Sequence, residues 1–364
     1  MADARSALAR ARRVVVKIGS STLAGDRSVF ARLADAIASR PSTSFVVVSS
    51  GAIALGMRKL GYRSRPKEMA RLQAAAAAGQ SLLMRAYEEA FAERDLAVAQ
   101  VLLTHADLAD RVRANNARAA LGALLDAGAV PILNENDSVA VEEIRFGDND
   151  QLAAMVAPLV EADLVILLSD VDGLLDSAGR RIPVVRDVAA EAVPHVRASA
   201  RGVGSGGMAS KVEAARRAML AGANVVVADA RAEGIVDAVL SGKDVGTLFV
   251  GARDRLSAKK YWIAFTLRPR GDVVLDRGAV EAVRAKGKSV LAVGVLGVRG
   301  DFHAGDAVRI IDVEGHEVAR GLARCSVADA AAVAGKPRAD LPGPLADLAV
   351  VVHADELVVG SHSG

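Results

Sequence analysis

Two lysines in this sequence lie beside glycine-rich segments, an arrangement that suits phosphate binding. Lys17 is followed by Ile18 and then by Gly19-Ser20-Ser21, and Lys211 ends the segment Gly-Ser-Gly-Gly-Met-Ala-Ser-Lys (204–211). Backbone N–H groups in such turns can bind phosphate oxygens while an ammonium group neutralises their charge. Taken singly, Lys17 could reach water from a strand end, and the second segment, whose spacing differs from a Walker A loop, could be a flexible turn. Together they indicate a site where two ammonium groups face a polyphosphate.

A polar cluster, Asp148-Asn149-Asp150, precedes a predicted helix that starts near Gln151. Asp150 could simply cap that helix, but the cluster is denser than capping requires. Only His105 and His195 occur in the first 255 residues, and neither lies in a glycine-rich segment. Hydrolases and kinases that act on alcohols normally need such a base, whereas a carboxylate acceptor, with a pKa of about 4, is already an anion at neutral pH. Lysines, Mg²⁺ and backbone donors supply the charge neutralisation that phosphoryl transfer to a carboxylate requires.

These residues must be positioned by the elements around them. Short apolar runs rich in β-branched residues alternate with longer helical segments through the first 255 residues. Continuous apolar runs are typical of parallel strands that are buried on both faces, and the alternation predicts a layered α/β sandwich. The predicted strands are 14–18, 45–48, 97–103, 130–133, 164–168 and 224–228, and the predicted helices are 68–94, 112–127, 151–161 and 208–221.

Polar or glycine residues follow four of the predicted strands. In open parallel sheets, ligands bind beyond the carboxyl ends of the strands. We therefore expect these segments to converge on one edge of the sheet, a pattern more specific than any single motif. The segments are 19–21, 49–52, 134–137 and 169–170.

The character of the sequence changes near residue 255. Short β runs separated by glycines follow, with one helical stretch among them, which predicts a small, mainly β domain. The predicted strands are 273–275, 289–293, 307–311 and 348–352, and the predicted helix is 279–285. We expect a first domain over 1–255, a linker over 256–275 and a second domain over 276–364.

The composition is that of a folded protein with two domains. The chain has 364 residues, of which 52% are hydrophobic and 24% charged, so disorder is excluded as its main state. The single cysteine, Cys325, excludes an internal disulfide and a Cys-based zinc site, and we expect it to be buried. Because the sequence shows no secretory signal and no run of 18 uncharged apolar residues, we expect a cytoplasmic protein outside the membrane.

The distribution of charge argues against RNA as a partner. The pI is about 9.1, a value common among nucleic-acid-binding domains, but the net charge is only +3. From Asp276 onward the chain has 10 basic and 12 acidic residues, so the basic excess belongs to the first domain. The second domain therefore offers little of the phosphate attraction on which RNA binding depends.

Six motifs make the sequence similar to the amino acid kinase family, and within it to the members that phosphorylate glutamate. In chain order they are Val-Val-Val-Lys-Ile-Gly-Ser-Ser (14–21), Val-Ser-Ser-Gly-Ala-Ile-Ala (48–54), Asn-Glu-Asn-Asp-Ser-Val (134–139), Gly-Asp-Asn-Asp (147–150), Leu-Ser-Asp-Val-Asp-Gly-Leu (168–174) and Gly-Ser-Gly-Gly-Met-Ala-Ser-Lys (204–211). The tail resembles a PUA domain, best over residues 300–308. The resemblance implies a three-layer αβα sandwich with a mostly parallel open sheet, followed by a small, mainly β PUA pseudo-barrel.

The resemblance also implies an activity and its partners. The reaction would be ATP-dependent phosphorylation of the γ-carboxylate of L-glutamate to L-glutamyl 5-phosphate, the first step of proline synthesis. Mg²⁺ would be held mainly by the ATP phosphates, without a metal site in the protein. The resemblance further implies a homo-oligomer, feedback inhibition by proline and a partnership with the reductase that consumes glutamyl 5-phosphate. Two alternatives compete with this function. An RNA-binding PUA protein with a degenerate kinase domain is disfavoured because both lysine loops are intact, and the closer alternative is an enzyme with a different acid as acceptor.

The site residues follow by matching these motifs to the family. Lys17, Asp150 and Lys211 would form the catalytic centre, with the lysines on either side of the transferring phosphoryl group and Asp150 holding them in position. Ser50, Asp137 and Asn149 would bind glutamate. The implied ATP-binding residues are Lys17, Gly19, Gly51, Ala52, Ser169, Asp170, Ser205, Gly206, Gly207, Met208, Ala209, Ser210 and Lys211.

Overall fold

The computed structural model describes residues 2–25, 28–139, 148–196, 207–252, 256–341 and 343–360. The contacts of the chain divide it into two compact units, Met1–Arg255 and Leu256–Gly364. Within the described ranges, no helix is both long and apolar enough to cross a membrane.

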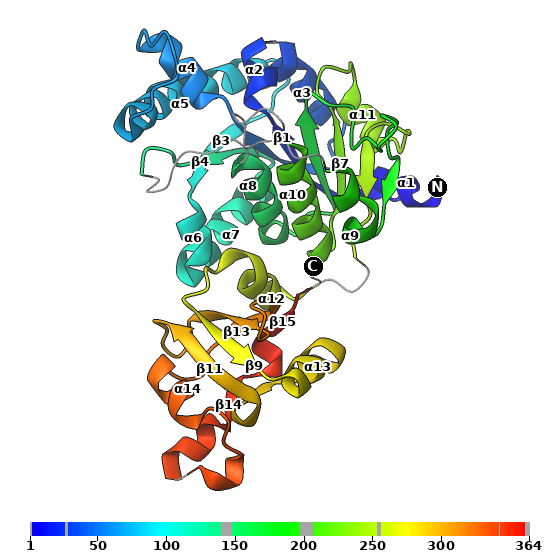
Figure 1. Cartoon of the computed structure of the whole chain (residues 1–364). Helices are drawn as coiled ribbons and strands as arrows, with labels where there is room; N and C mark the ends of the chain where they lie inside the picture. Colours follow the sequence, from blue (N-terminus) through cyan, green and yellow to red (C-terminus); the bar gives the residue numbers. More distant parts are fainter. Residues whose placement is uncertain are drawn as a thin grey trace. The chain divides into compact units, whose positions relative to one another are not determined.

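The first unit contains a sheet of eight strands in the order β3-β4-β2-β1-β5-β7-β8-β6. Figure 1 labels β1, β3, β4 and β7 of this sheet. All neighbours in this sheet are parallel except β7 and β8, which run antiparallel. Strand β5 is buried along its whole length, which explains its uninterrupted apolar sequence. The strands are β1 (Arg13–Ile18), β2 (Ser44–Ser49), β3 (Val98–Leu103), β4 (Val130–Glu135), β5 (Leu164–Ser169), β6 (Val184–Val185), β7 (Asn224–Asp229) and β8 (Thr247–Phe249).

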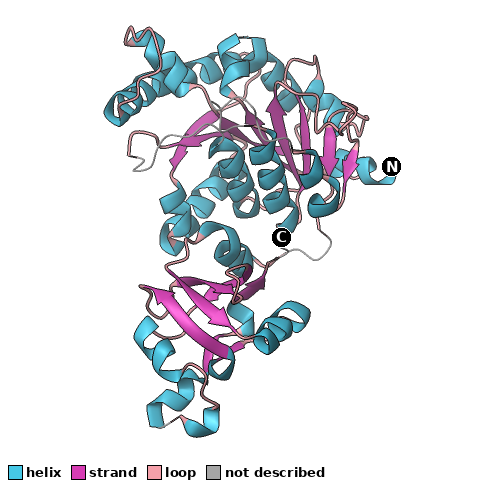
Figure 2. Cartoon of the chain, in the orientation of Figure 1, coloured by secondary structure: helices cyan, strands magenta, loops and turns pink. Residues whose placement is uncertain are grey.

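Helices cover both faces of this sheet (Figure 2). In β1, Val14 and Val16 join the core beside α3, α5 and α11, whereas Val15 joins the core beside α7, α8 and α10, because successive side chains of a strand point to opposite faces. The predicted three-layer αβα sandwich is therefore confirmed. The helices are α1 (Ala2–Ser6), α2 (Ser20–Gly25), α3 (Ser28–Ala38), α4 (Ala52–Lys59), α5 (Met69–Ala92), α6 (His105–Ala109), α7 (Arg111–Asp126), α8 (Asp148–Leu159), α9 (Val188–Glu191), α10 (Met208–Leu220) and α11 (Ile235–Leu240), with short 3₁₀ turns at Leu8–Arg10 and Val193–His195.

Helices α4 and α5 cross with their backbones in contact. A Cβ atom at Gly56 of α4 would overlap the carbonyl of Ala75, and one at Gly79 of α5 would overlap the carbonyl of Ala52. The alanine-rich part of α5 thus forms a close packing face, since larger side chains would hold the two helices apart. The contact also fixes the position of Ala52, the first residue of α4. Ala52 follows Gly51, whose backbone has the left-handed conformation (φ 103°).

The second unit contains a five-stranded sheet in the order β11-β9-β12-β13-β15 and a two-stranded sheet, β10-β14. Phe302 and Cys325 are buried in its core, so the predicted burial of the cysteine is confirmed, as is the mainly β character of the tail. Its elements are α12 (Ala258–Tyr261), the π-helix η3 (Trp262–Thr266), β9 (Gly271–Leu275), α13 (Arg277–Lys286), β10 (Val290–Leu291), β11 (Val295–Gly300), β12 (Ala307–Ile311), β13 (Glu317–Leu322), α14 (Val327–Val333), β14 (Val350–Val352) and β15 (Leu357–Val359), with 3₁₀ turns at Ala292–Gly294, Arg338–Asp340, Gly343–Ala349 and Ala354–Glu356.

The structure corrects the predicted linker over residues 256–275. Helices α12 and η3 occupy its first part, and β9 at its end is an inner strand of the five-stranded sheet. Ile263 and Ala264 are buried against strand residues of the same unit, including Leu322. The charged and turn-forming residues on either side of this apolar stretch suggested a linker, but burial of the apolar side chains makes it part of the second unit.

Candidate active site

The polar segments that follow the strands lie together because their strands are neighbours. Strands β4, β2, β1 and β5 are consecutive in the sheet, and Ile18 at the end of β1 is in register with Ser49 of β2 and Leu168 of β5. All four strands run in the same direction. The segments after them therefore meet at one edge of the sheet, where parallel α/β proteins bind ligands.

A buried carboxylate bridges the two lysines at this edge. Asp150 Oδ1 lies 2.7 Å from Lys17 Nζ, and Asp150 Oδ2 lies 3.2 Å from Lys211 Nζ. The side chain of Asp150 is fully buried, and those of Lys17 and Lys211 are only 7% and 6% exposed. Sequence reasoning offered capping as one role for Asp150, but the residue lies inside the first turn of α8 and pairs with both lysines instead.

Three different elements supply this cluster. Lys17 is on the same face of β1 as Val15, which contacts the core formed by α8 and α10. Asp150 and Lys211 lie in the first turns of α8 and α10, and these helices pack against each other (Figure 1). The N-terminal end of α10 carries partial positive charge from its unpaired backbone N–H groups. The site therefore combines two ammonium groups, one carboxylate and a helix end that favours anions.

Burial and two neighbouring charged groups shift the pKa of Lys17. Burial lowers the pKa of the Lys17 ammonium below its ordinary value, Asp150 raises it, and the nearby Lys211 lowers it. The net effect is a lowered pKa. A polyanionic ligand placed against both lysines would favour their charged forms.

Next to the lysines, an amide network connects α8 with β2 and β4. The two N–H groups of Asn149 Nδ2 are shared among three acceptors, which are Ser50 Oγ (2.8 Å), Asn134 Oδ1 (3.0 Å) and the Ser49 carbonyl (3.0 Å). Asn149 Oδ1 is buried and has no hydrogen-bond partner among the described residues. This oxygen is therefore an acceptor available to a ligand with an N–H or O–H group.

The network continues into α5, which sequence reasoning did not connect with the site. Asn134 Nδ2 donates to Gln80 Oε1 (2.9 Å), and the Tyr87 hydroxyl donates to Ser49 Oγ (2.9 Å). Both Gln80 and Tyr87 are buried. No motif marks them, because helical residues far along the chain become neighbours of the site only when α5 packs against the sheet.

On the other side of Lys17, Ser169 ends β5 and Asp170 follows it. Ser169 Oγ donates to Asp170 Oδ1 (3.0 Å), and the carbonyl of Asp170 accepts from Arg231 Nη2 (2.9 Å). Residues 208–211 form the first turn of α10, with Gly207 before it, and the Ser210 carbonyl accepts from Gln151 Nε2 (3.0 Å). The structure thus brings β5 and α10 to the same edge as Lys17.

The remaining predicted site residues follow β1, β2 and β4 or lie outside the described residues. Gly19 directly follows β1, Ala52 is the first residue of α4, and Gly51 precedes it. Asp137 lies in a turn after β4, and its charge opposes the lowering of the pKa of Arg65 that burial causes. Arg65, like Gln80 and Tyr87, is a residue near the site that sequence reasoning missed. Ser205 and Gly206 lie outside the described residues.

The fold, the strand-end site and two family models identify the class of protein. The model of the amino acid kinase family matches residues 12–229, and the model of the PUA domain matches residues 271–342. The chain belongs to the amino acid kinase family, as its motifs predict, and its C-terminal unit carries a PUA domain.

Curated relatives place the chain more narrowly within that family. It is 47% identical to the glutamate 5-kinase of Thermus thermophilus (96% of this chain, 97% of the relative) and 46% identical to that of Myxococcus xanthus (98% of each). It is 44% identical to the glutamate 5-kinase of Trichlorobacter lovleyi (99% of this chain, 100% of the relative). The similarity therefore includes both units.

Proposed function

We propose that this chain transfers the γ-phosphoryl group of ATP to the γ-carboxylate of L-glutamate, giving ADP and L-glutamyl 5-phosphate, the first step of proline synthesis. The observation that carries the proposal is the pair of buried lysines bridged by Asp150 at the carboxyl edge of the sheet. Curated glutamate 5-kinases that match nearly the full length of the chain support the choice of substrate. We assign this reaction to residues 1–255.

Charge neutralisation explains how the lysines would act. The attacking carboxylate and the γ-phosphate are both anions, so they repel each other as they approach. Lys17 and Lys211 would donate hydrogen bonds to oxygens of the transferring phosphoryl group and stabilise the charge of the transition state. The acceptor is ionised at neutral pH, so the reaction needs no general base. Asp150 is a positioning residue, because it holds both ammonium groups at one point.

The amide network would select and orient glutamate. Ser50, Asp137 and Asn149 form the proposed glutamate site. The buried Asn149 Oδ1, which has no partner among the described residues, would accept a hydrogen bond from the substrate ammonium, and the Asp137 carboxylate would pair with the same charge. Because Asn149 also bonds Ser50 and Asn134, the substrate would meet groups whose positions are already set.

The ATP site is proposed between the ends of β1, β2 and β5 and the start of α10. Backbone N–H groups at Gly19, Gly51 and Ala52 would bind phosphate oxygens, and Ser169, Asp170 and residues 207–211 would line the nucleotide pocket. Mg²⁺ would be bound mainly by those phosphates. This fits the donor set, because the Asp150 carboxylate already pairs with two lysines. In the described part of the chain, the one cluster of three potential metal ligands is Asp312, Glu314 and His316 in the second unit.

The family suggests further partners, which we propose for this chain. They are a second copy of the chain in a homo-oligomer, proline as a feedback inhibitor and the reductase that consumes glutamyl 5-phosphate. We further propose a cytoplasmic location.

Substrate profiling of the purified full chain tests the function. ADP release is measured with Mg²⁺-ATP and, in parallel, glutamate, aspartate, acetylglutamate or carbamate, and hydroxylamine is added to trap the acyl phosphate as a hydroxamate. We expect ADP and hydroxamate to form at equal rates with glutamate and at least tenfold more slowly with the other acids. A higher rate with another acid, or ADP release without hydroxamate, would refute the proposed reaction.

A further inference from the structure

The segment that follows β5 leaves the sheet at Ser169, and its backbone makes two hydrogen bonds at Leu174. The Leu174 amide donates to Thr247 Oγ1 (2.8 Å), and the Leu174 carbonyl accepts from the amide of Ile182 (2.8 Å). Residues 174–182 thus form a closed turn. Thr247 contacts both ends of this turn, and the segment that carries Ser169 and Asp170 ends at its first residue, Leu174.

The hydroxyl of Thr247 closes this turn with two hydrogen bonds. It accepts from Leu174 and donates to the carbonyl of Ile182 (2.7 Å). Thr247 is fully buried, so water cannot replace either bond. Gly173 (φ +135°) approaches so closely that a Cβ atom on it would overlap Thr247 Oγ1. The segment after β5 and the start of β8 are therefore in close contact, with no space for a side chain at Gly173.

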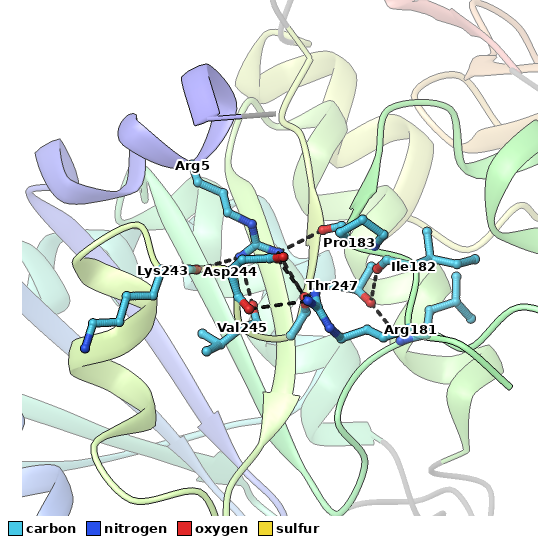
Figure 3. A network of polar contacts seen from close by, with 10 residues as sticks. Arg5, Arg181, Ile182, Pro183, Lys243, Asp244, Val245 and Thr247 are labelled. Carbon is cyan, nitrogen blue, oxygen red and sulfur yellow. Dashed lines mark hydrogen bonds and ion pairs between the residues drawn. The ribbon is translucent and has the colours of Figure 1, made fainter.

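A charged network fixes the backbone that precedes Thr247 (Figure 3). Arg5, from α1, is buried and donates to the carbonyls of Pro183 (2.8 Å), Val245 (2.8 Å) and Gly246 (2.9 Å). Arg181 also donates to the Gly246 carbonyl. The Asp244 carboxylate pairs with both guanidinium groups, at 3.1 Å from Arg5 and 3.0 Å from Arg181. These contacts hold Gly246 against residues 181–183 at one end of the turn, and so position the adjacent Thr247.

A second side-chain contact to this segment, from Arg231, is more exposed. Arg231 donates to the Asp170 carbonyl (2.9 Å), but its side chain is 69% exposed and also pairs with Asp229. Exposed ion pairs constrain geometry weakly. The buried bonds of Thr247 are therefore the stronger constraint on the segment, which belongs to the proposed nucleotide pocket.

We infer that Thr247 is a positioning residue for ATP: through Leu174 it sets the segment that carries Ser169 and Asp170. The inference rests on the proposed function, in which that segment binds the nucleotide. Thr247 itself contacts no residue assigned to glutamate in the described part of the chain. Its loss would weaken nucleotide binding and leave glutamate binding in place.

Thr247→Val tests this inference, because it keeps the size of the side chain and removes both hydrogen bonds. We expect the KM for ATP to rise about tenfold, with kcat and the KM for glutamate within about twofold of the wild-type values. Thr247→Ser keeps the hydroxyl and should restore the KM for ATP to within about twofold. Ser326→Ala is the matched control, since it also removes a hydroxyl that accepts one hydrogen bond and donates another, both with Asp329 of the second unit; it should leave the KM for ATP unchanged.

Direct binding separates failure of the inference from failure of the proposed function. The Kd for ADP, measured by calorimetry on the full-length variants, should rise about tenfold for Thr247→Val whether or not glutamate is the acceptor. An unchanged Kd, or equal changes in both KM values, would overturn the inference. If Thr247→Val does not fold, Arg181→Met provides the test: a rise of about threefold in the Kd for ADP is expected, and an unchanged Kd would contradict it.

Discussion

Asp150→Asn tests whether one carboxylate holds the two lysines in place for catalysis. The contacts of 2.7 and 3.2 Å correspond to attractions of roughly 5–6 kcal/mol each at an effective dielectric constant of about 20, before the cost of burial is included. Burial offsets much of this, and removing one partner of a buried ion pair typically costs about 3–5 kcal/mol. Asn keeps the shape of the side chain but leaves two buried ammonium groups that repel each other.

The variant should therefore lose both stability and rate. We expect kcat to fall by about 10²–10³, the typical effect of losing one preorganised charge contact at the transition state. Thermal unfolding should shift to a lower temperature, and added Mg²⁺-ATP should recover more of this loss than it adds to the wild type, because the phosphates supply the missing negative charge. The assays are thermal unfolding with and without nucleotide and ADP release at saturating substrates. Asp35→Asn, which removes a surface ion pair with Arg94, is the control and should leave kcat within about twofold.

The pH profile provides a second measurement on the same variant. Burial and Lys211 lower the pKa of Lys17, while Asp150 raises it. Removing the charge of Asp150 takes away the raising effect, so the pKa of Lys17 falls further. The charged ammonium is the active form, so the alkaline limb of kcat/KM should move to lower pH. A variant with kcat within threefold of the wild type and an unmoved alkaline limb would refute the reasoning.

Three other predictions concern neighbouring residues. Lys17→Ala and Lys211→Ala should each lower kcat by about 10², through a loss of about 3 kcal/mol of transition-state stabilisation, with far-UV circular dichroism unchanged; a wild-type kcat in either variant would remove that lysine from the mechanism. Asn149→Ala should mainly raise the KM for glutamate in steady-state assays, and an effect confined to the KM for ATP would contradict its role. Tyr87→Phe should lower the free energy of unfolding by about 1 kcal/mol, measured by urea denaturation, because it removes the buried bond to Ser49; equal stability would show that this bond contributes nothing.

Local sequence patterns predicted the elements that carry the lysines. The apolar run 14–18 is β1, and the helix expected at 208–221 is α10, which ends one residue earlier. These predictions succeed because burial on both faces, or a helical packing face, requires apolar residues at regular spacing. Strand β13 was missed, because Glu317 and Arg320 interrupt its apolar residues; the two side chains pair with each other, and both are partly exposed.

The candidate site was predictable only in its motifs. The strand-end segments and the two lysine loops were visible, and the strand order places four of those segments together. The pairing of Asp150 with both lysines was implied by the family resemblance, and local reasoning alone could not separate it from helix capping. Gln80 and Arg65 carried no signal, since each is an ordinary polar residue until the packing of the first unit places it near the site.

The sequence by itself determined the class of fold, the two-unit organisation and the residue types that meet at the edge of the sheet. These properties depend on the spacing of apolar residues and on short motifs, which the chain encodes within a few turns or one strand. Tertiary structure alone decided the hydrogen bonds that orient the site. Tyr87 and Ser49 are 38 residues apart, and Arg5 lies 241 residues from Gly246. Such pairs meet only when the helices pack on the sheet, because the distance between their atoms depends on how all the intervening helices and strands pack.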